Sequence, residues 1–192
     1  MPLPPTAGRE LLHVRNLDLR GYRRADGLYE VEGHVTDVRS HPLDTPGSDQ
    51  PQPAGVPVHD MTVRLVLDEE MTISEVITLT DAGPYRECPE AGGSLAALRG
   101  AKIGPGWTAR VKALLGPQSC THLVEILIPM ATVAYQTLAP VRFARADKLN
   151  AADRPVKIDS CYAYASGRAL VKKVWRAHYT GPEQDGAAGA VP

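Results

Sequence analysis

Residues 28–38 alternate between apolar and polar side chains, and this period of two constrains the fold more than any other feature of the sequence. The apolar face holds Tyr29, Val31, Gly33 and Val35, and the polar face holds Glu30, Glu32, His34 and Thr36. A looser alternation covers residues 11–20, and the dipeptide Asp26-Gly27 between the two runs favours a tight turn. The two runs therefore predict an antiparallel β-hairpin.

A second hairpin is expected from residues 58–67 and 72–80, which are rich in aliphatic and β-branched side chains. His59 begins the apolar face of the first of these strands, and residues 68–70 form the turn. Between the two hairpins, residues 41–57 are polar and rich in proline, so we expect no regular structure there. A segment of this length is either a disordered loop or a functional lid.

Residues 119–138 are the best candidate for a helix, because Leu123, Ile126, Leu127 and Met130 recur at helical spacing. Ser119 or Thr121 can cap its N-terminus, and Pro129 is expected to kink or divide it. The sequence therefore predicts an α+β fold, an antiparallel β-sheet built from hairpins with one long helix, about residues 120–138, packed on it.

Three shorter segments carry weaker signals. A short helix is expected over residues 94–99, because Gly100 can close it as a C-cap. Residues 107–115 resemble a strand, and two strand-like runs around Ser166-Gly167 suggest a third hairpin within residues 156–179.

The composition limits the class of protein. Gly and Pro supply 17 residues each out of 192, which argues against a bundle of long helices. A net charge of −1 excludes a strongly basic nucleic-acid binder, and no apolar run approaches the roughly 20 residues of a membrane helix. The first residues lack the basic-then-apolar pattern of a signal peptide, so we expect a cytoplasmic protein with neither nucleic acid nor membrane as a partner. Residues 9–180 are expected to form a single domain, with flexible tails at 1–8 and 181–192.

The cysteines predict neither a disulfide framework nor a zinc motif. Cys88, Cys120 and Cys161 are odd in number and far apart, and neither CxxC nor HExxH occurs. They could converge with His122 on a metal, but their spacing does not require it, and free cysteines are commonly buried. We therefore expect no metal and no other cofactor.

The strongest candidates for acid/base chemistry are histidines near carboxylates. Glu32 and His34 project from one face of the same strand, close enough to cooperate through a substrate or water, although a sheet with one solvated face has the same pattern. His59 lies at the rim of an apolar face beside the long loop, where it either lines a pocket or bonds to a backbone carbonyl.

Candidates for substrate binding lie at the first hairpin and at the start of the long helix. Arg24 could hold a carboxylate through its guanidinium fork, or it could pair with Glu30 or Glu32. Tyr22 and His122 complete the expected substrate-binding set. His122 and Cys120 fall in the first helical turn, where the helix dipole lowers the pKa of a thiol and where capping is the simpler interpretation.

Five short blocks, in this order along the chain, resemble a bacterial family of unknown function, DUF2889. They are residues 21–28 (GYRRADGL), 32–37 (EGHVTD), 58–61 (VHDM), 120–123 (CTHL) and 158–162 (IDSCY). The resemblance covers about residues 11–179, and it departs from the family pattern at Tyr162, where a histidine is expected. The family name implies no activity, but the resemblance extends to some proteins of bacterial catabolism of lignin-type aromatic compounds, where an acid/base lyase would fit.

Our leading hypothesis is a cofactor-independent acid/base enzyme, because no nucleotide-binding motif and no nucleophile elbow is present. It would be a lyase of the retro-aldol or elimination type that acts on a small aromatic or carboxylated metabolite. Formaldehyde is one product that such a reaction could release. His59, Glu32 and His34 would be catalytic, and Arg24, Tyr22 and His122 would bind the substrate. The alternatives are a non-catalytic ligand-binding or assembly module and a metal-dependent hydrolase using some of His59, His122, Cys88 and Cys120. A homo-oligomer is also expected.

Overall fold

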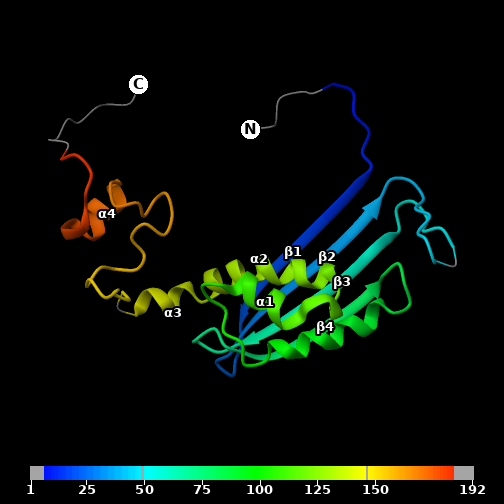
Figure 1. The fold of residues 1–192 in the computed structure, drawn as a ribbon, viewed down its shortest axis with the longest axis horizontal. Helices are drawn as coiled ribbons and strands as arrows, with labels where there is room; N and C mark the ends of the chain where they lie inside the picture. Colours follow the sequence, from blue (N-terminus) through cyan, green and yellow to red (C-terminus); the bar gives the residue numbers. More distant parts are fainter. Residues whose placement is uncertain (1–6, 49, 146, 184–192) are drawn as a thin grey trace. The chain divides into compact units, whose positions relative to one another are not determined.

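The computed structural model contains a four-stranded antiparallel β-sheet in the order β1-β2-β3-β4 (Figure 1). The strands are β1 (His13–Arg23), β2 (Tyr29–Arg39), β3 (Pro57–Leu67) and β4 (Ile73–Ala82). Each is paired with its neighbour in sequence, so the sheet consists of the two predicted hairpins joined by the β2–β3 pair. The predicted α+β class and its hairpins are confirmed.

Helices cover one face of this sheet (Figure 1). The long helix α2 (Thr121–Thr137) packs on β1, β2 and β3, while α1 (Trp107–Leu115) packs on α2 and on a 3-10 helix (Cys88–Leu98) that lies against β4. The described residues also form a 3-10 turn (Gly116–Gln118), α3 (Ala139–Ala144), α4 (Ala169–Val174) and a second 3-10 turn (Arg176–His178). No helix of the described residues is both long enough and apolar enough to cross a membrane.

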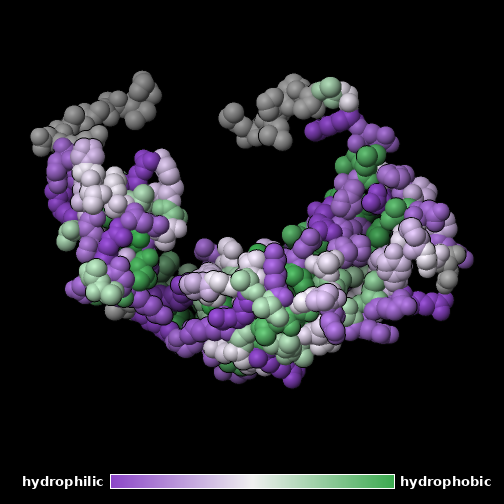
Figure 2. Space-filling view, viewed as in Figure 1, coloured by the Kyte–Doolittle hydropathy of each residue, from purple (hydrophilic) through white to green (hydrophobic). Residues whose placement is uncertain are grey.

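The core lies between the sheet and α2. The apolar side chains buried there include Val31, Val35, Met61, Val63 and Leu65 from the strands and Leu123, Ile126, Leu127, Met130 and Ala134 from the helix. Burial of this aliphatic surface is the main source of stability, since each fully buried side chain contributes about 1.5–3 kcal/mol. Outside the core, hydrophilic and hydrophobic residues are interspersed over the surface that Figure 2 shows.

Glycine allows α2 to approach the sheet closely. A Cβ atom added at Gly33 of β2 would lie 2.8 Å from the Met130 sulfur and would also clash with the Ile126 side chain. Gly21 of β1 meets Thr137 in the same way near the other end of α2. The two glycines therefore allow the short distance between α2 and the sheet. This packing also positions the first turn of the helix.

Two secondary-structure predictions are wrong. Residues 107–115 form α1 instead of a strand, because Trp107, Val111 and Leu115 recur every four residues and all three are buried on one helical face. The hairpin predicted within residues 156–179 is absent from the described residues, where α4 forms and buries Val171. The helix expected over 94–99 is part of a longer 3-10 segment that begins at Cys88, and Gly100 follows it with a φ of 78°.

The long helix also differs from prediction in detail. It is not divided at Pro129, which lies inside α2. Its N-cap is Cys120, so neither Ser119 nor Thr121 caps it.

The chain is described over residues 7–48, 50–145 and 147–183, and its contacts divide it into two units, Met1–Pro140 and Val141–Pro192. The sheet and the helices that cover it belong to the first unit. The single domain expected over residues 9–180 stays a prediction, and the tails predicted at 1–8 and 181–192 lie largely outside the described residues.

Candidate active site at the end of the sheet

A row of polar residues crosses the sheet at one end of its apolar face. Asp37 of β2 pairs in register with Arg15 of β1 and with His59 of β3. Asp37 continues the alternating row of Tyr29, Val31, Gly33 and Val35, so it points toward the helices and not toward solvent. Of the described residues, Asp37 is the only polar or charged one that is fully buried.

Each carboxylate oxygen of Asp37 accepts two hydrogen bonds. The Arg15 guanidinium donates from Nε to Oδ1 at 2.7 Å and from Nη2 to Oδ2 at 2.8 Å, and His13 Nε2 lies 2.9 Å from Oδ1. His59 Nδ1 lies 2.9 Å from Oδ2. Burial alone would raise the pKa of Asp37, but the hydrogen bonds and charge of Arg15, helped by His13 and His59, outweigh it and lower the pKa to about 2. Asp37 is therefore an anion at any physiological pH.

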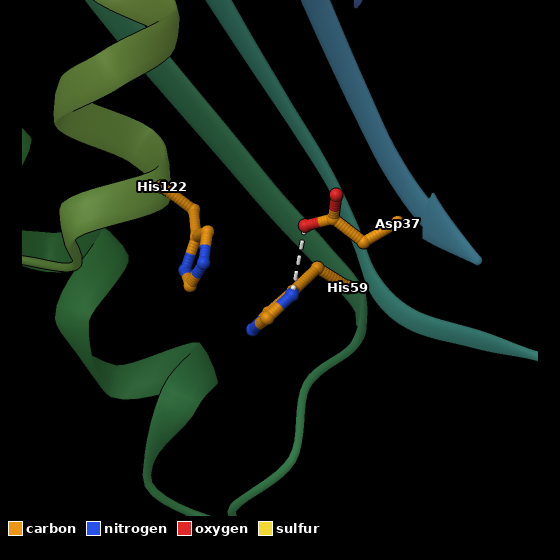
Figure 3. Close-up of side chains that lie close together, drawn as sticks. All are labelled: Asp37, His59 and His122. Carbon is orange, nitrogen blue, oxygen red and sulfur yellow. Dashed lines mark hydrogen bonds and ion pairs between the residues drawn. The ribbon is translucent and has the colours of Figure 1, made fainter. Parts of the chain in front are cut away.

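The hydrogen bond from His59 to Asp37 determines which ring nitrogen of His59 is free. An ionised carboxylate can only accept, so His59 Nδ1 carries the proton and Nε2 keeps its lone pair when the ring is neutral. Figure 3 shows Nε2 on the side of the ring away from Asp37. Burial, together with the nearby charge of His122, lowers the pKa of His59, although Asp37 opposes the shift. His59 is thus held as a neutral, oriented imidazole.

His122 faces His59 from the first turn of α2 (Figure 3). The centroids of the two rings are 3.6 Å apart and their planes are tilted by 32°. Two imidazolium ions at this separation would repel each other strongly, so a positive charge on one ring favours the neutral form of the other.

Cys120 raises the pKa of one of the two rings. Its Sγ lies 3.7 Å from His122 Nδ1, and this hydrogen bond is the main reason why the pKa of His122 is raised, against the opposing effect of burial. Burial would raise the pKa of the Cys120 thiol, but the contact with His122 and the backbone N–H groups of His122 and Leu123 lower it. The pair therefore favours a thiolate beside an imidazolium.

These groups surround a cavity of about 230 Å³ lined by His13, Arg15, Asp37, Arg39, Leu43, Val58, His59 and His122. Leu43 comes from the segment between β2 and β3, which is held by two backbone hydrogen bonds between Leu43 and Gln52. The prediction that residues 41–57 lack regular strands or helices agrees with the described residues up to Val56, since Pro57 begins β3, and this segment supplies one wall of the cavity. A larger open hollow, of about 740 Å³, is lined by residues 47, 48, 50 and 83–87, and none of these described residues is a histidine or a cysteine.

Two of the predicted site residues meet at this cavity, and four do not. His59 and His122 line it together. Glu32 and His34 point to the opposite face of the sheet, where Glu32 accepts hydrogen bonds from Arg64 at 2.6 and 2.8 Å and His34 Nε2 lies 2.6 Å from Asp60. The expected cooperation of His59 with Glu32 or His34 is therefore corrected, because adjacent positions of a strand project to opposite faces.

Arg24 and Tyr22 also lie away from the cavity. Arg24 pairs with Glu30 at 2.9 Å, which is one of the alternatives that the sequence left open, and it also pairs with Asp26 at 2.7 Å. Tyr22 is an exposed residue of β1 opposite Glu30. Neither can contact a ligand bound beside His59.

The same cluster also has the composition of a metal site. One potential ligand atom from each of Asp37, His59 and His122 lies within 4.8 Å of the other two, and two histidines with a carboxylate can bind a divalent transition metal. The fit is imperfect, because the four hydrogen bonds to Asp37 use the lone pairs that a metal would need. Of the cysteines, Cys120 contacts His122, but none belongs to the metal-ligating clusters found among the described residues.

Sequence reasoning missed Asp37, Arg15 and Arg39 as site residues. The signal for Asp37 was present, because a carboxylate stands where the alternating row of β2 calls for a fifth apolar residue. Arg15 carried no comparable signal, since β1 is exposed along nearly all its length and its pattern is loose.

Comparison with known proteins gives one match. The family model described as "Protein of unknown function (DUF2889)" matches residues 13–136, which is more than half of the chain and includes every strand, α1 and nearly all of α2. No curated protein and no solved structure matches the chain.

Proposed function

The chain belongs to the DUF2889 family, whose description states no activity, and from the geometry of the cavity we propose that it is an acid/base enzyme. His59 is the general base and His122 is the general acid, while Asp37 orients His59 and Cys120 keeps His122 protonated. All four residues lie within the part of the chain that the family model matches.

The observation that carries this proposal is the contact between two histidines whose pKa values are shifted in opposite directions. The pKa of His59 is lowered by burial and by His122, and the pKa of His122 is raised by its hydrogen bond with Cys120. When the pKa values of neighbouring groups are shifted in opposite directions, one group is ready to accept a proton and the other to donate one at the same pH. A purely structural pair of stacked histidines would not need both a carboxylate and a thiol as separate partners.

The reaction that fits this pair best is a lyase step of the retro-aldol type. His59 Nε2 takes the proton of a substrate hydroxyl, the oxygen electron pair forms a carbonyl, and the adjacent carbon–carbon bond breaks. The electron pair of that bond remains on the second carbon, which accepts a proton from His122. His59 gains one proton and His122 loses one, so solvent restores both rings after the products leave.

A metal-dependent hydrolase is the second candidate, and the close approach of Asp37, His59 and His122 favours it. In that case His59 and His122 would be ligands of a divalent metal that activates water. Asp37 fits this role less well, since Arg15 already occupies both of its oxygens and would lie beside the metal charge.

The experiment is a screen of small aromatic and aliphatic β-hydroxy acids with purified protein in D₂O, followed by NMR. We expect a carbonyl product, and deuterium on the carbon that accepts the proton. His59→Ala and His122→Ala should each lower the rate by about 10²–10⁴-fold, the usual contribution of a general acid or base. His178→Ala, which removes a histidine from the second unit, is the matched control and should leave the rate unchanged.

The screen also separates the alternatives. Activity that survives removal of metal by EDTA supports the acid/base proposal, whereas activity lost with EDTA and restored by Zn²⁺, Mn²⁺ or Fe²⁺ supports the hydrolase. A substrate that His59→Ala converts as fast as the wild-type protein would contradict both roles of His59. Binding of compounds with no conversion of any of them would favour the non-catalytic module.

A further inference from the structure

Arg39 lines the cavity and has no partner for its charge among the residues that the structure describes. It is the last residue of β2, it pairs in register with His13, and both residues belong to the cavity wall. Within the described residues its guanidinium forms no hydrogen bond or ion pair. Such a group at a concave surface retains all five of its N–H donors for a ligand.

The other arginine of the cavity differs in this respect. Arg15 directs Nε and Nη2 to Asp37 and Nη1 to Glu125, so its charge is neutralised within the protein. Asp37 is likewise neutralised by Arg15. Arg39 is therefore the source of an excess positive charge in the cavity, and this charge favours an anion.

The rest of the wall indicates the shape of that anion. Leu43 and the buried Val58 supply apolar surface, and His59 and His122 supply the reactive groups. A volume of about 230 Å³ is below the ~300–1,000 Å³ of pockets for drug-sized ligands, so the ligand is small. An apolar body with a single anionic end matches these surfaces.

We propose that the cavity is the binding site of a small carboxylic acid whose carboxylate is held by Arg39. This inference rests on the proposed function, since it treats the cavity as the place where the substrate of His59 and His122 is bound. A planar carboxylate suits one free guanidinium, which can donate two parallel hydrogen bonds to it. A phosphate dianion would bring a second negative charge toward Asp37 with no second free cation among the described lining residues.

The test measures binding without any need for turnover. Benzoate, its neutral isostere benzamide and inorganic phosphate are titrated separately into the full-length protein by calorimetry, and the ring resonances of His59 and His122 are followed by NMR. We expect benzoate to bind and to shift both rings. Its affinity should exceed that of benzamide and of phosphate by about tenfold or more, as expected for a charge-assisted hydrogen-bonded pair.

Arg39→Gln should weaken benzoate binding by about tenfold or more while leaving the weak binding of benzamide unchanged. Arg99→Gln is the matched control, because Arg99 is an exposed arginine next to Gly100, which bonds to Ile73 at the opposite end of the sheet. Equal binding of benzoate and benzamide to the wild-type protein, which needs no variant, would overturn the proposal. Stronger binding of phosphate than of benzoate, or unchanged benzoate binding to Arg39→Gln, would also overturn it.

The test also distinguishes failure of this site from failure of the proposed function. His59→Ala should still bind benzoate, since Arg39 is intact. If benzoate binding depends on Arg39 but the activity survives in His59→Ala, the carboxylate site is supported and the acid/base role of His59 is overturned. If the activity is lost in His59→Ala but benzoate binding is unchanged in Arg39→Gln, the acid/base role is supported and the carboxylate site is overturned.

Discussion

Asp37 on β2 and His59 on β3 lie directly opposite each other in the sheet, and Asp37 Oδ2 accepts a hydrogen bond from His59 Nδ1 at 2.9 Å. Backbone pairing therefore sets the geometry of the two side chains, and neither depends on a mobile loop. The same row extends to Arg15 on β1, which donates hydrogen bonds to both oxygens of the carboxylate. This arrangement gives an ionised, fully hydrogen-bonded Asp37 and a His59 whose neutral ring carries its proton on Nδ1.

Asp37→Asn should lower the free energy of unfolding at neutral pH. The folded pKa of about 2 lies below the ordinary 3.8, so the unfolded chain binds the proton more readily, and the ionised group stabilises the fold by about 2 kcal/mol above pH 4. This contribution is lost as the pH falls through 2. Urea unfolding between pH 7 and 2 should show a gap between wild type and variant that closes at low pH. Asp44→Asn, at an exposed position, is the control, and a gap that is constant with pH would contradict the linkage.

Gly33→Ala should destabilise the fold by about 1–3 kcal/mol, the usual cost of overpacking a core. The new methyl group would meet the side chains of Ile126 and Met130, so these must repack or α2 must move off the sheet. Such a movement would also separate His122 from His59. Gly93→Ala is the matched control, since a Cβ at Gly93 has no neighbour within 4 Å, and its effect should stay within about 0.5 kcal/mol. Equal unfolding free energies for the two variants, measured in urea, would show that the helix is not packed as described.

Cys120→Ser should lower the pKa of His122 toward the ordinary 6.5, because a serine hydroxyl does not ionise and cannot favour the imidazolium as a thiolate does. Titration of the His122 ring by NMR measures this shift. Cys161→Ser, which removes an exposed cysteine in the second unit, should leave the pKa of His122 unchanged. An unchanged pKa in Cys120→Ser would mean that the thiol is not the partner that raises it.

Local patterns were enough to predict most of the sheet and the long helix. The alternation in β2 and the spacing of Leu123, Ile126, Leu127 and Met130 in α2 both reflect one face buried against the same core. The failure at residues 107–115 has a physical cause, because so short a segment with β-branched and aromatic residues satisfies both periodicities until its neighbours are known.

The site was predictable only in part. His59 and His122 could each be named from their own strand or helix, but their contact depends on where α2 docks, which is a non-local property. Glu32 and His34 were grouped with His59 because all three are suited to acid/base chemistry, and the alternation that placed them on the polar face argued against that grouping. Asp37 was overlooked even though it interrupts an apolar row, and a buried carboxylate at such a position is a strong indication of a site.

The central claim is that His59 and His122 form a base and an acid, and NMR titration of their ring nitrogens tests it most directly because no substrate is required. We predict that His59 stays neutral with its proton on Nδ1 and titrates below the ordinary pKa of 6.5, while His122 titrates above 6.5. The proposed activity, measured with a substrate found in the screen, should then fall at acid pH as His59 is protonated and at alkaline pH as His122 loses its proton. Titration of both rings together near 6.5, or of His59 above His122, would contradict the account.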